Sequence, residues 1–146
     1  MNHKKFSINI FWLLAIFALI LGGVIYVLFK GNSYISVFVR QFIPVLGEEI
    51  VIINSSCRVL YYLPDFLWAL SLSCGLHIIF MPEMKGSLLC TFAVVGLGLV
   101  FEILQFLEFV NGTGDIIDVI MYLLAGMSVN LINLKRRTIN GKYQSG

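Results

Sequence analysis

Four stretches of the chain are strongly apolar, at residues 8–29, 63–80, 87–107 and 115–134. Together they hold only four charged side chains, and all four are carboxylates. A helix of about 20 apolar residues spans the ~30 Å hydrocarbon core of a bilayer. The pattern therefore predicts an all-α integral membrane protein that lies in the lipid bilayer. It should be a single domain built as a four-transmembrane-helix bundle.

The first stretch follows Lys4 and Lys5, and no A-x-A cleavage site comes after it. It is longer than the apolar region of a cleaved signal peptide, so we interpret it as a retained signal-anchor helix. Ala15, Ala18 and Gly22 form a strip of small residues that lets another helix approach closely. We expect this strip to pack inside the protein rather than in a dimer. Because the stretch has no polar stripe, its helix should be the most lipid-exposed of the four.

Basic residues indicate the orientation of the chain in the membrane. Four spans place both ends on one side, which then carries seven of the ten basic residues: Lys4, Lys5, Lys85, Lys135, Arg136, Arg137 and Lys142. The other side carries Lys30, Arg40 and Arg58. The positive-inside rule therefore predicts a multi-pass protein of the bacterial cytoplasmic membrane with both termini in the cytoplasm. The tail at 135–146 is expected to be cytoplasmic and disordered.

Residues 31–62 form the longest connection and, in this orientation, an outer loop. The segments at 34–46 and 50–53 are rich in apolar residues, but no charge-free run reaches 18 residues. The loop should therefore contain short amphipathic helices that lie in the membrane interface. A re-entrant segment is the alternative.

The second stretch begins with Pro64 and Asp65. Proline suits the first turn of a helix, and a carboxylate suits its positive end. Deeper in the same stretch lies His77, which we expect to hydrogen-bond to a neighbour rather than to bind a ligand. No nucleophile–base pair and no HExxH or GxSxG motif is evident along the chain.

The third and fourth stretches carry polar and small residues on one helical face each. The third holds Thr91, Gly98, Glu102 and Gln105, and the fourth holds Asp115, Asp118, Tyr122, Gly126, Asn130 and Asn133. The short loop over 111–114 makes the two helices antiparallel neighbours, so their carboxylates gather at one end. Polar groups lack partners in lipid, so both stripes should face each other and the second stretch, with 87–134 as the inner pair of the bundle.

Composition excludes several classes of function. Charged residues make up 12% of the chain, against roughly 25% in soluble domains. The net charge is only +2 and no basic patch with interleaved aromatic residues occurs, so no nucleic acid partner is expected. Three cysteines without a CxxC pair predict neither a disulfide framework nor a zinc site, but small apolar packing residues.

One part of the chain resembles a known family. Glu102-Ile-Leu-Gln105, a short glycine-containing loop, Asp115-Ile-Ile-Asp118 and Gly126 are similar to the C-terminal half of VanZ-like membrane proteins. The match covers about 30 of the 146 residues, and Tyr122 stands where the family usually has asparagine. The resemblance implies a bacterial cell-envelope protein of a family in which some members are linked to resistance to glycopeptides such as teicoplanin.

Three functions remain open for the carboxylates. The first is an outward-facing acidic pocket that binds a lipid or cell-wall component, built from Asp65, Glu102, Gln105, Asp115, Asp118 and Tyr122 with Arg58 as the counter-charge. The second is a metal-dependent membrane enzyme acting on a lipid-linked phosphate, with a divalent cation at Asp115 and Asp118. The third is purely structural, with polar groups joining the helices and Asp115 serving as the N-cap of the fourth stretch. Neither a required cofactor nor an oligomeric state is predicted.

Overall fold

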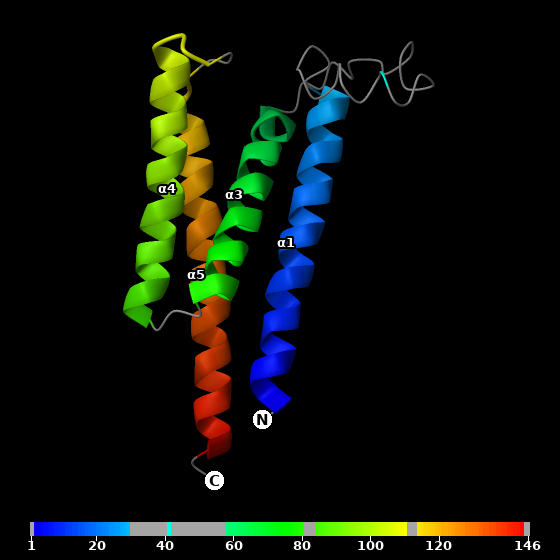
Figure 1. Ribbon diagram of the computed structural model, residues 1–146, viewed down its shortest axis with the longest axis vertical. Coiled ribbons are helices and arrows are strands. Elements are labelled where there is room, and N and C mark those ends of the chain that lie inside the picture. The colour runs from blue at the N-terminus through cyan, green and yellow to red at the C-terminus, as the bar shows by residue number, and fades with distance from the viewer. Residues whose placement is uncertain (1, 30–40, 42–57, 81–83, 111–113, 145–146) are drawn as a thin grey trace.

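The protein is a bundle of four long helices in a computed structural model (Figure 1). The structure describes residues 2–29, 41, 58–80, 84–110 and 114–144. The helices are α1 (Asn2–Phe29), α3 (Arg58–Phe80), α4 (Met84–Phe106) and α5 (Ile116–Gln144). The first turn of α1 and the last turn of α5 lie at the same end of the bundle in Figure 1. The interfacial helices expected in the outer loop fall outside the described residues.

Three of the helices contain segments long and apolar enough to cross a membrane. These segments are Tyr61–Phe80, Gly86–Phe106 and Ile116–Lys135. In α1 the apolar segment among the described side chains, Ile10–Tyr26, is shorter than these. The prediction of an all-helical protein with apolar spans is confirmed for α3, α4 and α5, and a membrane span by α1 stays a prediction.

Helix α3 is the centre of the bundle, because it packs against each of the other three described helices (Figure 1). Its small side chains Ala69, Ser73 and Cys74 are almost completely buried and let neighbours approach on several sides. Helix α4 contacts α3 and α5 but lies at the edge. The expectation that α4 and α5 form the inner pair is therefore wrong, since close packing favours the helix with small residues on more than one face.

Helix α1 packs along α3 alone among the described helices. Ala15 and Ala18 are buried, and a Cβ atom on Gly22 would lie 2.7 Å from Cδ1 of Trp68. The small-residue strip is thus an internal packing surface, as predicted. The opposite face of α1 leaves large apolar side chains such as Leu13, Phe17 and Ile20 exposed.

Four helix boundaries differ from the predicted ones by three residues or more. Helix α1 begins at Asn2, before the expected start at 8. Helix α3 begins at Arg58, so Pro64 and Asp65 lie inside it rather than in its first turn. The five residues before Leu63 contain no helix breaker, and Pro64 is fully buried against its neighbours. Helix α4 begins at Met84, before the expected start at 87. The tail predicted to be disordered continues α5 to Gln144, because residues 135–144 are rich in helix-forming basic side chains.

The end of α4 is a Schellman motif. The Phe109 N–H donates to the Leu104 carbonyl at 2.9 Å, and the Glu108 N–H donates to the Gln105 carbonyl at 3.0 Å. Glu108 occupies the left-handed position of this motif with a φ of 60°. The chain thereby reverses direction just beyond α4 and leads back into α5.

Candidate functional site

Glu102 is the central acceptor at one end of the bundle. Its side chain projects from α4 and is only 6% exposed. Oε1 accepts a hydrogen bond from the Tyr122 hydroxyl of α5 at 2.9 Å, and Oε2 accepts one from the Asp115 backbone N–H, also at 2.9 Å. Both carboxylate oxygens are thus held by neutral donors, which fixes the side chain between α4 and α5.

Asp115 immediately precedes α5 and caps its N-terminus. Oδ1 accepts the Ile117 N–H at 3.0 Å, and the Asp115 carbonyl accepts the Asp118 N–H at 3.1 Å. Its second carboxylate oxygen, Oδ2, accepts the hydroxyl of Tyr62 from α3 at 3.0 Å. One residue therefore ends the loop, starts α5 and joins α5 to α3, and the interpretation of Asp115 as a helix cap is confirmed.

Glycine at two positions allows close packing at this end of the bundle. A Cβ on Gly98 would lie 2.8 Å from Cγ of Tyr122 and closer still to two other ring atoms. A Cβ on Gly114 would lie 2.8 Å from the Glu102 carbonyl oxygen. The Tyr122 ring therefore lies directly on the backbone of α4, which brings its hydroxyl within reach of Glu102.

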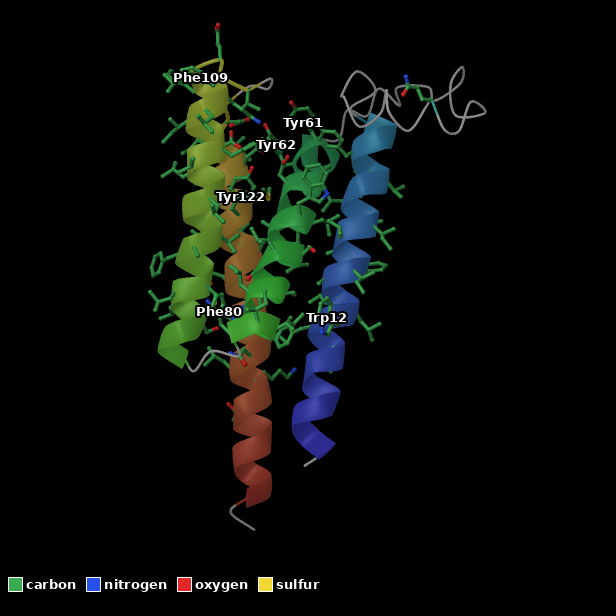
Figure 2. All side chains as sticks on the ribbon, in the orientation of Figure 1. Trp12, Tyr61, Tyr62, Phe80, Phe109 and Tyr122 are labelled. Atoms are coloured by element: carbon green, nitrogen blue, oxygen red, sulfur yellow. The ribbon has the colours of Figure 1, made fainter. Side chains whose placement is uncertain are left out.

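Four carboxylates converge around two tyrosines. Tyr122 lies within electrostatic range of Asp65, Glu102 and Asp118, and Tyr62 lies within range of Asp115 and Asp118. Asp118 is 6% exposed, and Asp65 is half-buried. We call Asp65, Glu102, Asp115 and Asp118 the acidic cluster. Tyr62 and Tyr122 mark its position toward the upper end of the view in Figure 2.

Two predicted residues of this site gain no described contact in it, and one residue of the site was not predicted. Gln105 is half-buried, and its side chain forms no hydrogen bond to the residues that the structure describes. Arg58 is the first residue of α3, and its proposed role as counter-charge falls outside the described side chains. Tyr62 was missed because residues 31–62 were interpreted as loop. Its place three residues before Asp65 would have indicated a shared helical face had α3 been extended upstream.

The polar stripes of α4 and α5 face each other, as predicted. Glu102 is buried, whereas Leu99, Val100 and Ile103 on the same helix are 44–55% exposed. Farther along the pair, a Cβ on Gly126 would lie 2.6 Å from Cγ2 of Thr91. Within the described chain, no three His, Cys, Asp or Glu residues gather as ligands for a metal ion.

A second polar network joins the same three helices toward the other end of the bundle. His77 of α3 contacts the Ser87 hydroxyl of α4 through Nε2 at 2.7 Å. The Ser87 hydroxyl donates to Oδ1 of Asn130 from α5, and the Asn130 amide Nδ2 donates to Thr91 Oγ1 at 2.6 Å. His77, Ser87, Thr91 and Asn130 are all buried. We call these four residues the buried relay.

The contacts of His77 define the tautomer of its neutral ring. Nδ1 lies 2.8 Å from the Ser73 carbonyl oxygen, which can only accept, so Nδ1 carries the proton. Nε2 faces Ser87 Oγ, whose hydroxyl donates to Asn130 Oδ1. The expectation that His77 bonds to a neighbour is confirmed. The contact between His77 and Ser87 forms only when α3 and α4 fold back on each other.

Two of the three cysteines lie among the described residues. Cys74 and Cys90 are free and buried, in agreement with their interpretation as packing residues. Cys57 lies outside the described residues.

Comparison with known proteins adds no family to this picture. No protein-family model matches the chain, and no curated protein and no solved structure matches it either. Membership of the VanZ-like family therefore stays a prediction that rests on the residues quoted above.

Proposed function

We propose that the chain is a VanZ-like, multi-pass protein of the bacterial cytoplasmic membrane whose acidic cluster faces outward and binds a cationic group of a lipid or cell-wall component. The observation that carries this proposal is the pair of contacts in which Glu102 accepts from Tyr122 and Asp115 accepts from Tyr62, with Asp118 buried at the same end of the bundle. A link to glycopeptide resistance belongs to the same proposal through the family resemblance.

The chemistry of the cluster favours an ammonium-bearing ligand. Carboxylates accept hydrogen bonds and cannot donate them, and like charges held close together in a poorly solvated region repel one another. The described partners of Glu102 and Asp115 are backbone N–H and tyrosine O–H groups, which leave the negative charge in place. A primary amine would add three donors and a positive charge, as in an ethanolamine headgroup or the free amine of a wall peptide.

A binding measurement tests the ligand class. The purified protein should unfold at a higher temperature in vesicles that include lipids with an ethanolamine headgroup than in vesicles whose lipids all carry a glycerol headgroup. Asp118→Asn should weaken binding at least about tenfold, because a hydrogen bond to a charged group contributes about 1.5–3 kcal/mol. A soluble lysine-containing peptide, titrated separately, distinguishes a wall peptide from a lipid as the source of the amine.

Glu108→Gln is the matched control for this measurement. Glu108 is an exposed carboxylate at the same end of the bundle, just beyond α4 and outside the acidic cluster. The substitution removes one negative charge without changing Glu102 or Asp115, so binding should be unchanged. If Asp118→Asn and Glu108→Gln weakened binding equally, the effect would come from general surface charge, which would contradict the proposal.

The orientation is tested by reporter fusions. Fusions within residues 30–62 and at Asn111 should behave as exported, and a fusion at Gln144 should behave as cytoplasmic. The reason is the excess of basic residues on the side of the termini. An exported reporter at Gln144 would place the acidic cluster on the cytoplasmic side and overturn the outward assignment.

A structural role is the second candidate, and one observation favours it. Both oxygens of Glu102 and both oxygens of Asp115 are already engaged within the bundle. If the cluster only joins helices, Asp118→Asn and Glu102→Gln should lower the amount of protein in the membrane. If the cluster binds a ligand, a strain that carries either variant should respond to a panel of envelope-targeting antibiotics like a strain in which the gene is disrupted. The amount of protein in the membrane should be unchanged.

A further inference from the structure

The buried relay has hydrogen-bond partners for one more proton than a neutral histidine carries. We propose that the relay is a proton-binding site, in which His77 takes up the proton and the side-chain amide of Asn130 turns over when the proton leaves. The inference is independent of the proposed function, because the acidic cluster lies toward the opposite end of the same helices. It makes the joint between α3, α4 and α5 sensitive to pH.

The hydrogen bonds of the relay require a proton on both ring nitrogens of His77. Nδ1 lies 2.8 Å from the Ser73 carbonyl oxygen, which can only accept. Nε2 lies 2.7 Å from Ser87 Oγ, and the Ser87 hydroxyl donates its one hydrogen to Asn130 Oδ1. The hydrogen between Nε2 and Oγ must then come from the ring. In this arrangement His77 is an imidazolium with two donors.

The orientation of the Asn130 amide sets the direction of these bonds. Its Nδ2 donates to Thr91 Oγ1 at 2.6 Å, so Oδ1 is the atom that faces Ser87. The Thr91 hydroxyl in turn donates to the Ser87 carbonyl of its own helix at 3.4 Å. Asn133 Nδ2 approaches Ser87 Oγ as a donor at 3.5 Å. Ser87 Oγ therefore gives one hydrogen and receives two, which uses its full capacity.

A half-turn of the Asn130 amide produces a second complete set of hydrogen bonds. The turn exchanges Nδ2 and Oδ1, which occupy nearly the same space. Nδ2 then donates to Ser87 Oγ, and the Ser87 hydroxyl is released to donate to Nε2 of a neutral ring. Oδ1 accepts from the Thr91 hydroxyl. The relay can therefore gain or lose a proton without leaving a buried polar group unsatisfied, which would be costly.

The surroundings of the imidazole favour a positive charge held by neutral groups. His77 is only 3% exposed and lies in the last turn of α3, where the helix dipole attracts a cation. The Phe11 ring of α1 packs on it with ring centroids 5.9 Å apart, within the range of attraction between a cation and an aromatic face. These groups offset part of the cost of removing the charge from water.

Among the side chains that the structure describes, no carboxylate lies close to the relay. The described side chains of α1, at 10–26, are uncharged. On the other helices the acidic cluster is 11 or more residues from the nearest relay residue, roughly 16 Å along the axis at ~1.5 Å per residue. Lys135 is exposed and lies five residues beyond Asn130, on a different face of α5. Cys74 and Cys90 lie within one turn of the relay, and buried thiols stay uncharged. Hydrogen bonds therefore hold the proton, without a salt bridge.

The relay lies near the end of the bundle where α3 ends and α4 begins. His77 is three residues before Phe80, the last residue of α3, which is labelled in Figure 2. Ser87 is three residues after the start of α4. At ~1.5 Å per residue both are roughly 5 Å from the helix ends. Both termini lie at this end in Figure 1, so the relay responds to pH on the side of the termini.

The bound proton changes how the three helices are joined. In the protonated state, His77 donates a charge-assisted hydrogen bond to Ser87, and such bonds are roughly twice as strong as neutral ones. The contact between α3 and α4 is then tighter, and Asn130 donates to Thr91. In the neutral state Asn130 donates to Ser87 instead. No covalent bond other than N–H forms or breaks, and water at the end of the bundle supplies and receives the proton.

Nitrogen NMR of the full-length protein in detergent tests the proposal. His3→Gln leaves His77 as the only histidine of the chain. Spectra are recorded from about pH 5 to about pH 8, the range in which histidines change charge. The two ring nitrogens should have nearly equal chemical shifts at the acidic end, as in an imidazolium, and widely different shifts at the alkaline end. Over the same interval the Asn130 amide hydrogens should exchange their nuclear Overhauser contacts with Thr91 for contacts with Ser87.

Asn130→Asp separates the relay from the titration of an ordinary histidine. A carboxylate only accepts hydrogen bonds, so aspartate cannot form the second set, and its negative charge favours the imidazolium. The ring nitrogens should therefore keep nearly equal shifts to a higher pH than in the parent protein. Ser128→Ala is the matched control, because Ser128 of α5 donates to the Leu124 carbonyl of its own helix at 2.8 Å. Its spectra should follow those of the parent.

Three results would overturn the proposal. The first is a His77 ring that keeps one protonation state over the whole pH range. The second is an Asn130 amide that keeps its contacts while the ring changes charge, because the proton would then move without the relay. The third is a folded Asn130→Asp variant that titrates like the parent. Should that variant fail to fold, the first two observations on the parent protein still decide.

Discussion

Replacing Gly98 by alanine is expected to destabilise the protein by about 1–3 kcal/mol, the usual cost of overpacking a closely packed interface. The new Cβ would lie 2.8 Å from Cγ of Tyr122 and closer to two further ring atoms. The ring lies against the α4 backbone, so it cannot move aside without separating α4 from α5. Separation would also break the hydrogen bond from Tyr122 to Glu102.

Gly96→Ala is the control, since it is the same substitution two residues away on the same helix. No atom lies within 4 Å of a Cβ at Gly96, so alanine should be neutral or stabilising by up to about 1 kcal/mol. Thermal or denaturant unfolding in detergent measures both variants. Equal stabilities for Gly98→Ala and Gly96→Ala would mean that Tyr122 does not pack on α4 as described.

Replacing Glu102 by alanine is expected to have the largest effect of any single substitution at the acidic cluster. It removes the acceptor of the Asp115 N–H and of the Tyr122 hydroxyl together. Each buried donor left without a partner costs about 1–3 kcal/mol, so the total loss is about 2–6 kcal/mol. Glu102→Gln keeps one acceptor oxygen and should lose less. The free energy of unfolding, measured in one detergent for all variants, provides the comparison.

A double-mutant cycle with Tyr122→Phe assigns the loss to the hydrogen bond. Phenylalanine keeps the ring on Gly98 but removes the hydroxyl, so the double variant should lose about 0.5–3 kcal/mol less than the sum of the two single losses. Strict additivity would show that Glu102 and Tyr122 act independently, in disagreement with their 2.9 Å contact.

The acidic cluster and the buried relay differ in the hydrogen-bond partners that surround their side chains. At the acidic cluster, Glu102 and Asp115 receive hydrogen bonds from N–H and O–H groups, which stabilise carboxylates but provide no acid–base partner. At the buried relay, His77 and Asn130 both contact the Ser87 hydroxyl, and all three side chains are buried. The first arrangement suits binding of a cation, and the second joins α3, α4 and α5.

Much of the architecture follows from the sequence alone. The length and apolarity of residues 63–80, 87–107 and 115–134 require helices, because a backbone in hydrocarbon must satisfy its own hydrogen bonds. The spacing of Glu102 and of Asp118 placed both on inward faces, which the structure confirms at 6% exposure each. Asp115 was identified as a helix cap from its place just before an apolar run. All these inferences depend on contacts close in sequence, where helical periodicity decides the geometry.

Only the tertiary structure decided which helix is central and which side chains meet across helices. An amphipathic pattern shows that a face is buried but not against which neighbour, so the sequence could not select α3 over α4 as the core of the bundle. The Tyr62–Asp115 and His77–Ser87 contacts depend on how far α3 extends and how it packs on α4 and α5. Packing of side chains between helices sets these distances, and no local pattern records it.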